Sequence, residues 1–241
     1  LAGLVATTVP VYLIARAMQP LMADAIRGHG GEYFAFVLVG MAATYFVASA
    51  CGALPGAVAS GVRNGTLEAL LATPAPLPAL LAGLAAYPLL WTALRAAVLL
   101  ATGAALGARY AWDGALAAAA VLALIVLAHL PFGLIGAAMV LAFRTTGPLI
   151  QGVLVVSMLM GGVYYPTEVV PGWIRPAAGA VPLTYGLRAL RRTLLEGATP
   201  ADVAGDVLAL AAFAAGLTAV GSAAVWAALR HARRAGTLAQ Y

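Results

Sequence analysis

The charged side chains of this 241-residue chain are few, and those that could take part in chemistry are widely separated. Glu68 lies in the polar stretch SGVRNGTLEALLATPAPLP, residues 60–78, which interrupts an otherwise apolar first half. Arg95 and His129 each stand alone in a long apolar run. The sequence contains no HExxH motif, no cluster of His and carboxylate residues and no nucleophile motif. Since metal ligands come in clusters, this pattern favours recognition over catalysis.

The polar stretch has the pattern of a short amphipathic helix over about residues 65–73. Glu68 falls in its first turn, where a negative charge suits the positive end of the helix dipole, and Pro74 stops the helix. The apolar stripe of this helix consists of leucines at i, i+3 and i+4 spacing, namely Leu67, Leu70 and Leu71. Nothing in the chain is obviously placed to cover this stripe. It either dips into lipid headgroups or docks onto a cytoplasmic partner.

The run Gly65-Thr-Leu-Glu-Ala-Leu-Leu-Ala-Thr-Pro74 resembles the cytoplasmic coupling segment of type-2 ABC transporter permeases. In that family a GTLE-x-LL-x-TP run follows the second membrane span, and the resemblance implies contact with a separate ATP-hydrolysing subunit. The leucines would fill a groove on the ATPase, and Glu68 would fix the helix start or pair with a basic residue there. The positions that the resemblance assigns to this coupling interface are Arg63, Gly65, Thr66, Leu67, Glu68, Leu70, Leu71, Thr73 and Pro74.

A second match lies in residues 166–200, where recurring prolines exclude a long helix from the first half. A helix is predicted from Pro182 to just before Gly197. We expect its leucines and its arginines on opposite sides, with Leu183, Leu187, Leu190 and Leu194 facing away from Arg188, Arg191 and Arg192.

Two runs in this region are similar to the P-x-W and P-L-T-Y-x-L-x-x-x-R segment before the last span of the same family. They are Val170-Pro-Gly-Trp-Ile-Arg175 and Val181-Pro-Leu-Thr-Tyr-Gly-Leu-Arg-Ala-Leu-Arg191. The resemblance implies a partly re-entrant helical segment on the outer side, whereas a generic interfacial loop is the alternative. Its expected site residues are Pro171, Trp173, Pro182, Thr184, Tyr185 and Arg191.

The composition excludes an ordinary soluble globule, because 63% of the residues are hydrophobic and 9% are charged, against roughly 25% charged in soluble domains. All 13 basic residues are arginines. A P-loop needs a lysine on the nucleotide phosphates, so this chain cannot contain that motif; if ATP drives it, another chain or a removed segment binds the ATP. The resemblance implies that ATP and Mg bind to the partner ATPase subunit. Cys51 is the only cysteine, which excludes an intrachain disulfide and a Cys-based zinc site. The small, scattered net charge of +5 suggests contact with anionic membrane lipid at the C-terminal tail and not with nucleic acid.

Hydropathy predicts an all-α polytopic membrane protein with six transmembrane helices, over residues 1–22, 33–59, 77–107, 114–143, 149–165 and 207–229. The coupling helix lies between spans 2 and 3, and the outer re-entrant segment between spans 5 and 6. We expect residues 1–241 to form a single transmembrane permease domain whose N-terminal cytoplasmic segment is missing. Thr199-Pro-Ala-Asp202 is predicted to start the last helix, and Gly52 and Gly56 permit close helix packing.

Arg95 and His129 have two interpretations each. An arginine at mid-membrane costs roughly 2.5–3.5 kcal/mol on insertion scales, so Arg95 either serves a substrate path or subunit pairing, or bonds a backbone carbonyl or snorkels. His129 either has a transport role or packs at the Pro131 kink and bonds a freed carbonyl.

The resemblance implies a membrane-spanning permease subunit of an ATP-driven ABC exporter in the cell membrane, whether inner or plasma membrane. The chain would not be an enzyme itself. It would act with an ATPase subunit and a second permease copy to move a hydrophobic or amphipathic substrate, such as a drug, a lipid or a polysaccharide-type molecule. The alternative is an ion-gradient-driven secondary transporter, which usually carries intramembrane carboxylates; all eight acids here lie at span ends or in loops. An intramembrane enzyme is the third possibility.

The absence of lysine yields a direct prediction. The purified chain alone should hydrolyse no ATP, because it cannot supply the lysine of a P-loop. A phosphate-release assay on the pure protein checks this, and hydrolysis above the level of a mock purification would contradict the assignment of ATP to a separate subunit.

Overall fold

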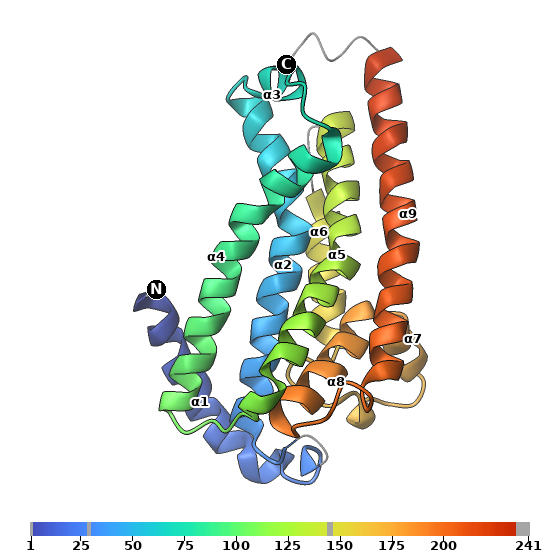
Figure 1. Cartoon of the computed structure of the whole chain (residues 1–241). Helices are drawn as coiled ribbons and strands as arrows, with labels where there is room; N and C mark the ends of the chain where they lie inside the picture. Colours follow the sequence, from blue (N-terminus) through green and yellow to red (C-terminus); the bar gives the residue numbers. More distant parts are fainter. Residues whose placement is uncertain (1, 28–29, 144–146, 235–241) are drawn as a thin grey trace.

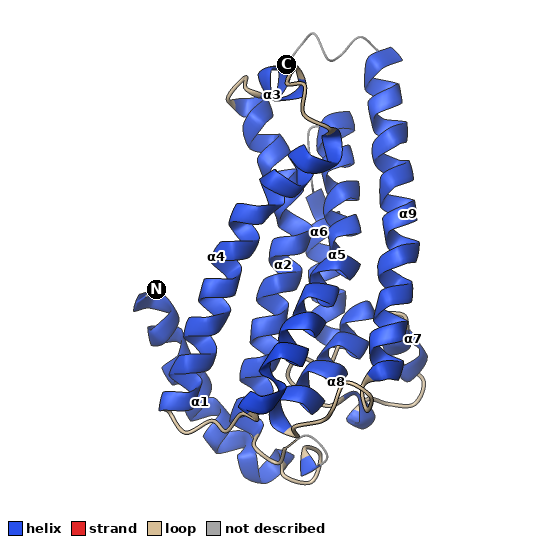
Figure 2. Cartoon of the chain, viewed as in Figure 1, coloured by secondary structure: helices blue, strands red, loops and turns tan. Residues whose placement is uncertain are grey.

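The computed structural model describes residues 2–27, 30–143 and 147–234, and this part of the chain is helical without strands (Figure 2). Long helices run alongside one another, and short ones gather at both ends of the molecule (Figure 1). The α-helices are α1 (Ala2–Met22), α2 (Tyr33–Arg63), α3 (Leu67–Leu71), α4 (Leu77–Ala105), α5 (Ala115–Phe143), α6 (Gly147–Met160), α7 (Arg175–Gly179), α8 (Pro182–Leu195) and α9 (Ala204–Arg234). Short 3-10 turns, η2 (Trp112–Gly114) and η3 (Thr167–Val169), lie in the connections.

Four helical stretches of the described residues are long and apolar enough to cross a membrane: Tyr33–Arg63, Pro78–Ala105, Trp112–Leu141 and Ala204–Ala223. They correspond to α2, α4, α5 with its preceding turn, and α9. Neither α1, which contains Pro10 and Pro20, nor the short α6 is among them. The chain is therefore a multi-pass membrane protein, and the arrangement of six spans stays a prediction.

The centre of the bundle is α2, which packs against α1, α4, α5, α6 and α8. Its partner α5 packs in turn against α9 and α8. Buried apolar side chains of α2, α5, α8 and α9 form one continuous core, which includes Val39, Val47, Cys51, Ile125, Ala128, Leu183, Leu187, Leu190 and Leu210. The amphipathic α8 thus closes one end of the bundle with its leucine face.

Glycines allow the closest helix contacts, though not the pair that the sequence suggests. A Cβ atom on Gly133 of α5 would lie 2.5 Å from the carbonyl oxygen of Ala50 on α2. A Cβ atom on Gly221 of α9 would lie 3.0 Å from a carbonyl oxygen of α5. At Gly52 and Gly56, in contrast, a Cβ atom would meet nothing within 4 Å. Gly52 and Gly56 therefore make no close contact with another helix in the described part of the chain, and the α2–α5 contact uses Gly133 instead.

The prediction for the fifth span, residues 149–165, is wrong at its C-terminal end. The helix stops at Met160 after 14 residues, which is about 21 Å at 1.5 Å per residue. Gly162 follows with a φ of +75°, in the left-handed region that glycine enters without steric cost. The chain turns there and leads into the segment before α8.

The last helix begins at Ala204 and not at Pro200 as predicted. The carboxylate of Asp202 accepts hydrogen bonds from the Thr199 backbone nitrogen at 2.9 Å and from its hydroxyl at 2.7 Å. These bonds hold the pKa of Asp202 below its usual value. The Asp202 carbonyl also accepts a bond from Arg192 at 2.8 Å. Residues 199–203 therefore form a separate turn before α9, with Asp202 reaching back as in a capping box.

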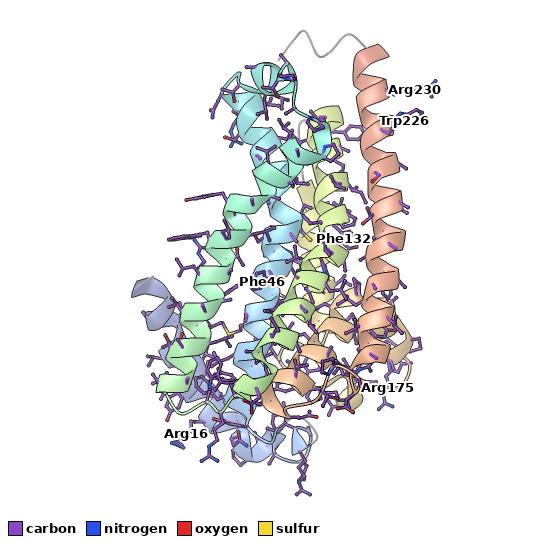
Figure 3. The ribbon with its side chains drawn as sticks, in the orientation of Figure 1. Arg16, Phe46, Phe132, Arg175, Trp226 and Arg230 are labelled. Atoms are coloured by element: carbon purple, nitrogen blue, oxygen red, sulfur yellow. The ribbon has the colours of Figure 1, made fainter. Side chains whose placement is uncertain are left out.

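The short helices lie at opposite ends of the bundle. α3 lies at the end where α9 finishes, whereas α7 and α8 lie at the other end (Figure 1). Arg230 on α9 marks the first end, and Arg175 at the start of α7 marks the second (Figure 3). The two sequence segments with a recognisable pattern are thus separated by the length of the bundle.

The α2–α5 contact predicts a contrast between two glycine substitutions. Gly133→Val should destabilise the protein, because the added atoms would collide with the α2 backbone, and overpacking of this kind typically costs about 1–3 kcal/mol. Gly83→Val on α4 should have little effect, since a Cβ atom at Gly83 meets nothing within 4 Å. Thermal unfolding in detergent, followed by loss of the monodisperse peak, measures both variants; equal stability of the two would contradict this contact.

Candidate functional site

The turn between α2 and α3 is a Schellman motif. Thr66 donates its backbone N–H to the carbonyl of Gly61 at 2.9 Å, and Gly65 donates to Val62 at 3.3 Å. Gly65 has a φ of +67°, as the residue after a helix C-cap commonly does. These bonds satisfy the last carbonyls of α2 and place α3 directly at the end of that helix.

The first leucine of the stripe is covered by the chain itself. Leu67 is 5% exposed and packs with Leu54 and Val58 of α2, Ala85 of α4 and Val140 of α5. The expectation that nothing in the chain covers the stripe is therefore wrong for Leu67, which anchors α3 to the bundle. The carbonyl of the preceding residue, Thr66, accepts a hydrogen bond from the backbone N–H of Leu70 at 3.1 Å, and this bond starts the next turn.

Leu70 is half-buried, and the described residues around it, such as Ala69, Ala72 and Thr73, are exposed. Thr73 ends the turn by donating both its backbone N–H, at 3.3 Å, and its hydroxyl, at 2.7 Å, to the carbonyl of Leu70. The exposed residues of the predicted interface are Arg63, Gly65, Thr66, Thr73 and Pro74. The side chains of Glu68 and Leu71 lie outside the part that the structure describes. The end of the molecule thus presents a hydrogen-bonded turn with half-buried Leu70 and an exposed rim, which is a surface suited to a protein partner.

At the opposite end, α7 and α8 form the predicted outer segment. Trp173 is 82% exposed and Pro171 is exposed, whereas Pro182 begins α8 as its first residue. The Thr184 hydroxyl donates to the carbonyl of Ala178 at 2.7 Å, and the Tyr185 hydroxyl donates to that of Gly179 at 3.0 Å. These bonds fix the angle between the two short helices.

The prediction that Arg191 lies on the side of α8 opposite the leucines is wrong. Arg191 is buried, with 3% of its surface exposed. Its guanidinium donates to the carbonyls of Gly162 at 2.9 Å, Val163 at 2.8 Å and Phe36 at 3.3 Å. It also lies 3.3 Å above the centre of the Phe36 ring, within cation–π range. The spacing in the sequence explains the burial, because position 191 follows Leu187 by four residues, and residues i and i+4 share a helix face.

Arg188 connects α8 to the last helix. Arg188 donates from Nε to both carboxylate oxygens of Asp206, at 2.8 and 3.0 Å, and from Nη2 to Oδ1. Asp206 lies in the first turn of α9. This pair could not be predicted from the sequence, since the two residues are 18 positions apart across an irregular loop and follow no helical spacing.

The two isolated membrane residues differ in environment. Arg95 is exposed at the side of α4, with its guanidinium 5.6 Å from the centre of the Trp91 ring. His129 is 0% exposed, and its Nδ1 lies 2.8 Å from the carbonyl oxygen of Ile125. The carbonyl that His129 reaches is that of its own preceding turn, and not the one that Pro131 leaves without a donor.

The buried guanidinium predicts a strong dependence of stability on Arg191. Arg191→Met should lower the melting temperature sharply, because buried carbonyls would lose their charged donor. Each buried polar group left unsatisfied costs roughly 1–3 kcal/mol of folding stability. Arg192→Met is the matched control, since Arg192 is more exposed and donates to one carbonyl. Thermal unfolding in detergent compares them, and equal melting temperatures would refute a structural role for Arg191.

The family of the chain follows from a comparison with known proteins. A model of the family described as ABC-2 type transporter matches residues 4–195, which covers α2, both recognisable segments and the connections between them. No curated protein matches the chain. The matched residues amount to well over half of the sequence, and so the chain belongs to the ABC-2 type transporter family as a membrane-spanning permease.

Proposed function

We propose that this chain is the permease subunit of an ATP-driven exporter, and that it couples to an ATPase subunit through α3. The observation that carries this proposal is the exposed rim around half-buried Leu70 at one end of the bundle, in a chain of the ABC-2 type transporter family. Membership of that family implies an ABC ATPase as partner. ATP and Mg would bind on the ATPase, because this chain has no lysine for a P-loop.

The mechanism rests on differential contact with the ATPase. A nucleotide can shift the permease between two conformations only to the extent that the ATPase binds them with different affinity. α3 is held to α2 by the Schellman turn and by Leu67, so a force on α3 acts directly on the central helix. We propose that two permease copies respond together to closure of two ATPase subunits.

The proposed topology has six membrane segments in the inner or plasma membrane, with residues 1–241 as one permease domain. In this topology α1 and α6 are the two segments that join the four long apolar helices in the membrane. The end of the bundle with α3 and the C-terminal arginines faces the cytoplasm, whereas α7 and α8 face outward. The chemistry of the lining supports a hydrophobic or amphipathic substrate, since the apolar groove beside α5 and α6 is lined by residues such as Phe132, Met139, Val153 and Val156.

An ion-gradient-driven secondary transporter is the alternative. Such proteins commonly carry carboxylates near the bilayer midplane. The acid of α9, Asp206, lies in the first turn of that helix and is paired with Arg188. No group of three or more His, Cys, Asp or Glu side chains gathers among the described residues, and the ATP-driven exporter is the better supported function.

The docking role of α3 predicts that Leu70→Asp abolishes recovery of the ATPase. A carboxylate would replace the apolar centre of the interface, where the loss of one residue commonly exceeds 1 kcal/mol, so we expect a reduction of roughly tenfold or more. The measurement is co-purification of the ATPase with the tagged permease from membranes that contain equal amounts of each variant.

Trp173→Asp is the matched control, because Trp173 is exposed at the opposite end of the molecule. It should leave recovery of the ATPase unchanged. Equal recovery with wild type and Leu70→Asp would sink the docking role and favour α3 as a lipid-surface helix.

A further inference from the structure

A groove of about 1070 Å³ lies between the first half of α5 and the start of α9. The two helices pack side by side along the bundle (Figure 1). The α5 wall of the groove contains small residues, namely Ala117, Ala120 and Ala123. Large apolar side chains are exposed along it, namely Leu116, Leu127 and Leu208. The groove therefore opens to the surroundings of the bundle.

The groove extends from the membrane surface to the centre of the bilayer. Asp113 in η2 lies at one end, and Leu127 lies at the other, halfway along the apolar stretch Trp112–Leu141. The path between them is about 21 Å of helix, close to half of the roughly 40–45 Å of a bilayer with its headgroups. Trp112 beside Asp113 is exposed, as tryptophans at a membrane interface commonly are. The groove thus spans one leaflet, at the end of the bundle with α8.

The groove is polar at the membrane surface and apolar below it. Asp113 and Thr199 carry the polar side chains among the residues that line it, and they lie before α5 and α9 begin. The Thr199 hydroxyl donates to the carboxylate of Asp202. The Asp113 carboxylate, in contrast, is exposed and has no ion pair or hydrogen bond in the described ranges of the chain. The groove thus ends at a carboxylate that is open to a cation from outside the chain.

The arginines of α8 that reach toward α9 do not supply this cation. Arg188 bonds both carboxylate oxygens of Asp206, and Arg192 bonds the carbonyl oxygen of Asp202. Neither arginine lines the groove. The charge at the mouth is therefore that of Asp113, which favours a positively charged group and disfavours an anionic one.

A second copy of the chain complements this surface poorly. A two-fold interface presents the same patch on both subunits. Centred here, it would place one hollow against another and one Asp113 carboxylate near its twin. α1 packs against α2 and α4, on the opposite side of the bundle from α9 (Figure 1). An apolar hollow in the hydrocarbon region is filled by lipid chains, because water finds no polar partners there.

We propose that the α5–α9 groove binds a phospholipid with an ethanolamine headgroup. The ammonium group lies on the Asp113 carboxylate, and one acyl chain lies over the alanines of α5 toward Leu127. This site is independent of the coupling role proposed for α3, which lies at the other end of the bundle (Figure 1).

The carboxylate at the mouth selects the headgroup. A primary ammonium donates hydrogen bonds to a carboxylate, and charge-assisted bonds of this kind are roughly twice as strong as neutral ones. The quaternary ammonium of a choline headgroup has no N–H to donate. A glycerol headgroup leaves the lipid with a net negative charge, which Asp113 repels.

The experiment measures contact between the groove and bromine-labelled lipid by the quenching of a single tryptophan. The four native tryptophans are changed to Phe, and Leu127→Trp places the reporter at the deep end of the groove. The full chain is reconstituted in phosphatidylcholine vesicles with a fixed fraction of either dibrominated phosphatidylethanolamine or dibrominated phosphatidylglycerol. We expect stronger quenching by the brominated phosphatidylethanolamine, and we expect Asp113→Asn to remove this difference between the two lipids.

A reporter outside the groove serves as the control. A second chain keeps Leu127 and Trp91, and its other three tryptophans are changed to Phe. Position 91 on α4 and position 127 on α5 both lie about 20 Å of helix from the ends of α4 and α5 nearest α8, so they probe a similar depth. Trp91 should be quenched equally by the two lipids, because it lies outside the groove.

Two neighbouring alanines test the acyl-chain half of the site in the reporter chain. Ala120 lines the groove and Ala119 does not, and both are exposed, so a larger side chain should leave folding intact at either position. Ala120→Leu should lower the quenching by brominated phosphatidylethanolamine, because the added side chain takes the place of the acyl chain. Ala119→Leu should leave it unchanged.

The proposal fails if the two brominated lipids quench the reporter at position 127 equally, or if their difference persists in Asp113→Asn. It also fails if this reporter is shielded from both lipids relative to Trp91, because protein, such as a second copy of the chain, then covers the groove.

Discussion

The buried guanidinium of Arg191 determines how the end of this bundle with α8 is built. It donates to carbonyls of two segments that are far apart in the sequence, Phe36 in α2 and Gly162 with Val163 after α6. A buried cation is costly unless it finds acceptors, and here backbone carbonyls accept from Nη1 and Nη2 in place of a carboxylate. Gly40 makes the approach possible, since a Cβ atom there would lie 2.4 Å from the Val163 carbonyl oxygen and 3.0 Å from Nη2 of Arg191.

The same helix that accepts from Arg191 carries the candidate coupling turn at its other end. α2 runs unbroken for 31 residues from Tyr33 to Arg63, with the Arg191 contact in its first turn and α3 attached after its last. Leu67 ties α3 to α4 and α5 as well as to α2. In the proposed function, a displacement of α3 would therefore reach the outer segment through one continuous helix, without passing through a flexible loop.

Local patterns were sufficient to locate α8, whose start at Pro182 and end before Gly197 depend on residues next to one another in the chain. The helix predicted over about residues 65–73 is shorter, because Gly65 forms the turn after α2 and α3 ends at Leu71, before Pro74. The orientation of Arg191 was also present in the sequence, at helical spacing from Leu187, but sorting side chains by polarity alone concealed it.

Other features depend on contacts that no local pattern reveals. Leu67 is covered because α4 and α5 arrive beside it, and the pairing of Arg188 with Asp206 depends on the path of the loop before α9. Gly52 and Gly56 have the spacing of a packing motif, yet the neighbouring helix stands away from them. Whether a small-residue pair contacts protein or lipid is decided by the whole bundle and not by the pair.

In the proposed function, the end of the bundle with α3 contacts the ATPase and the end with α8 does not. A photo-activated cross-linking amino acid placed at position 70 or at position 173 tests this directly in intact membranes that contain both subunits. We predict a covalent permease–ATPase product from position 70, where Leu70 is half-buried beside an exposed rim, and none from position 173. Cross-linking of the ATPase from position 173, with none from position 70, would contradict it.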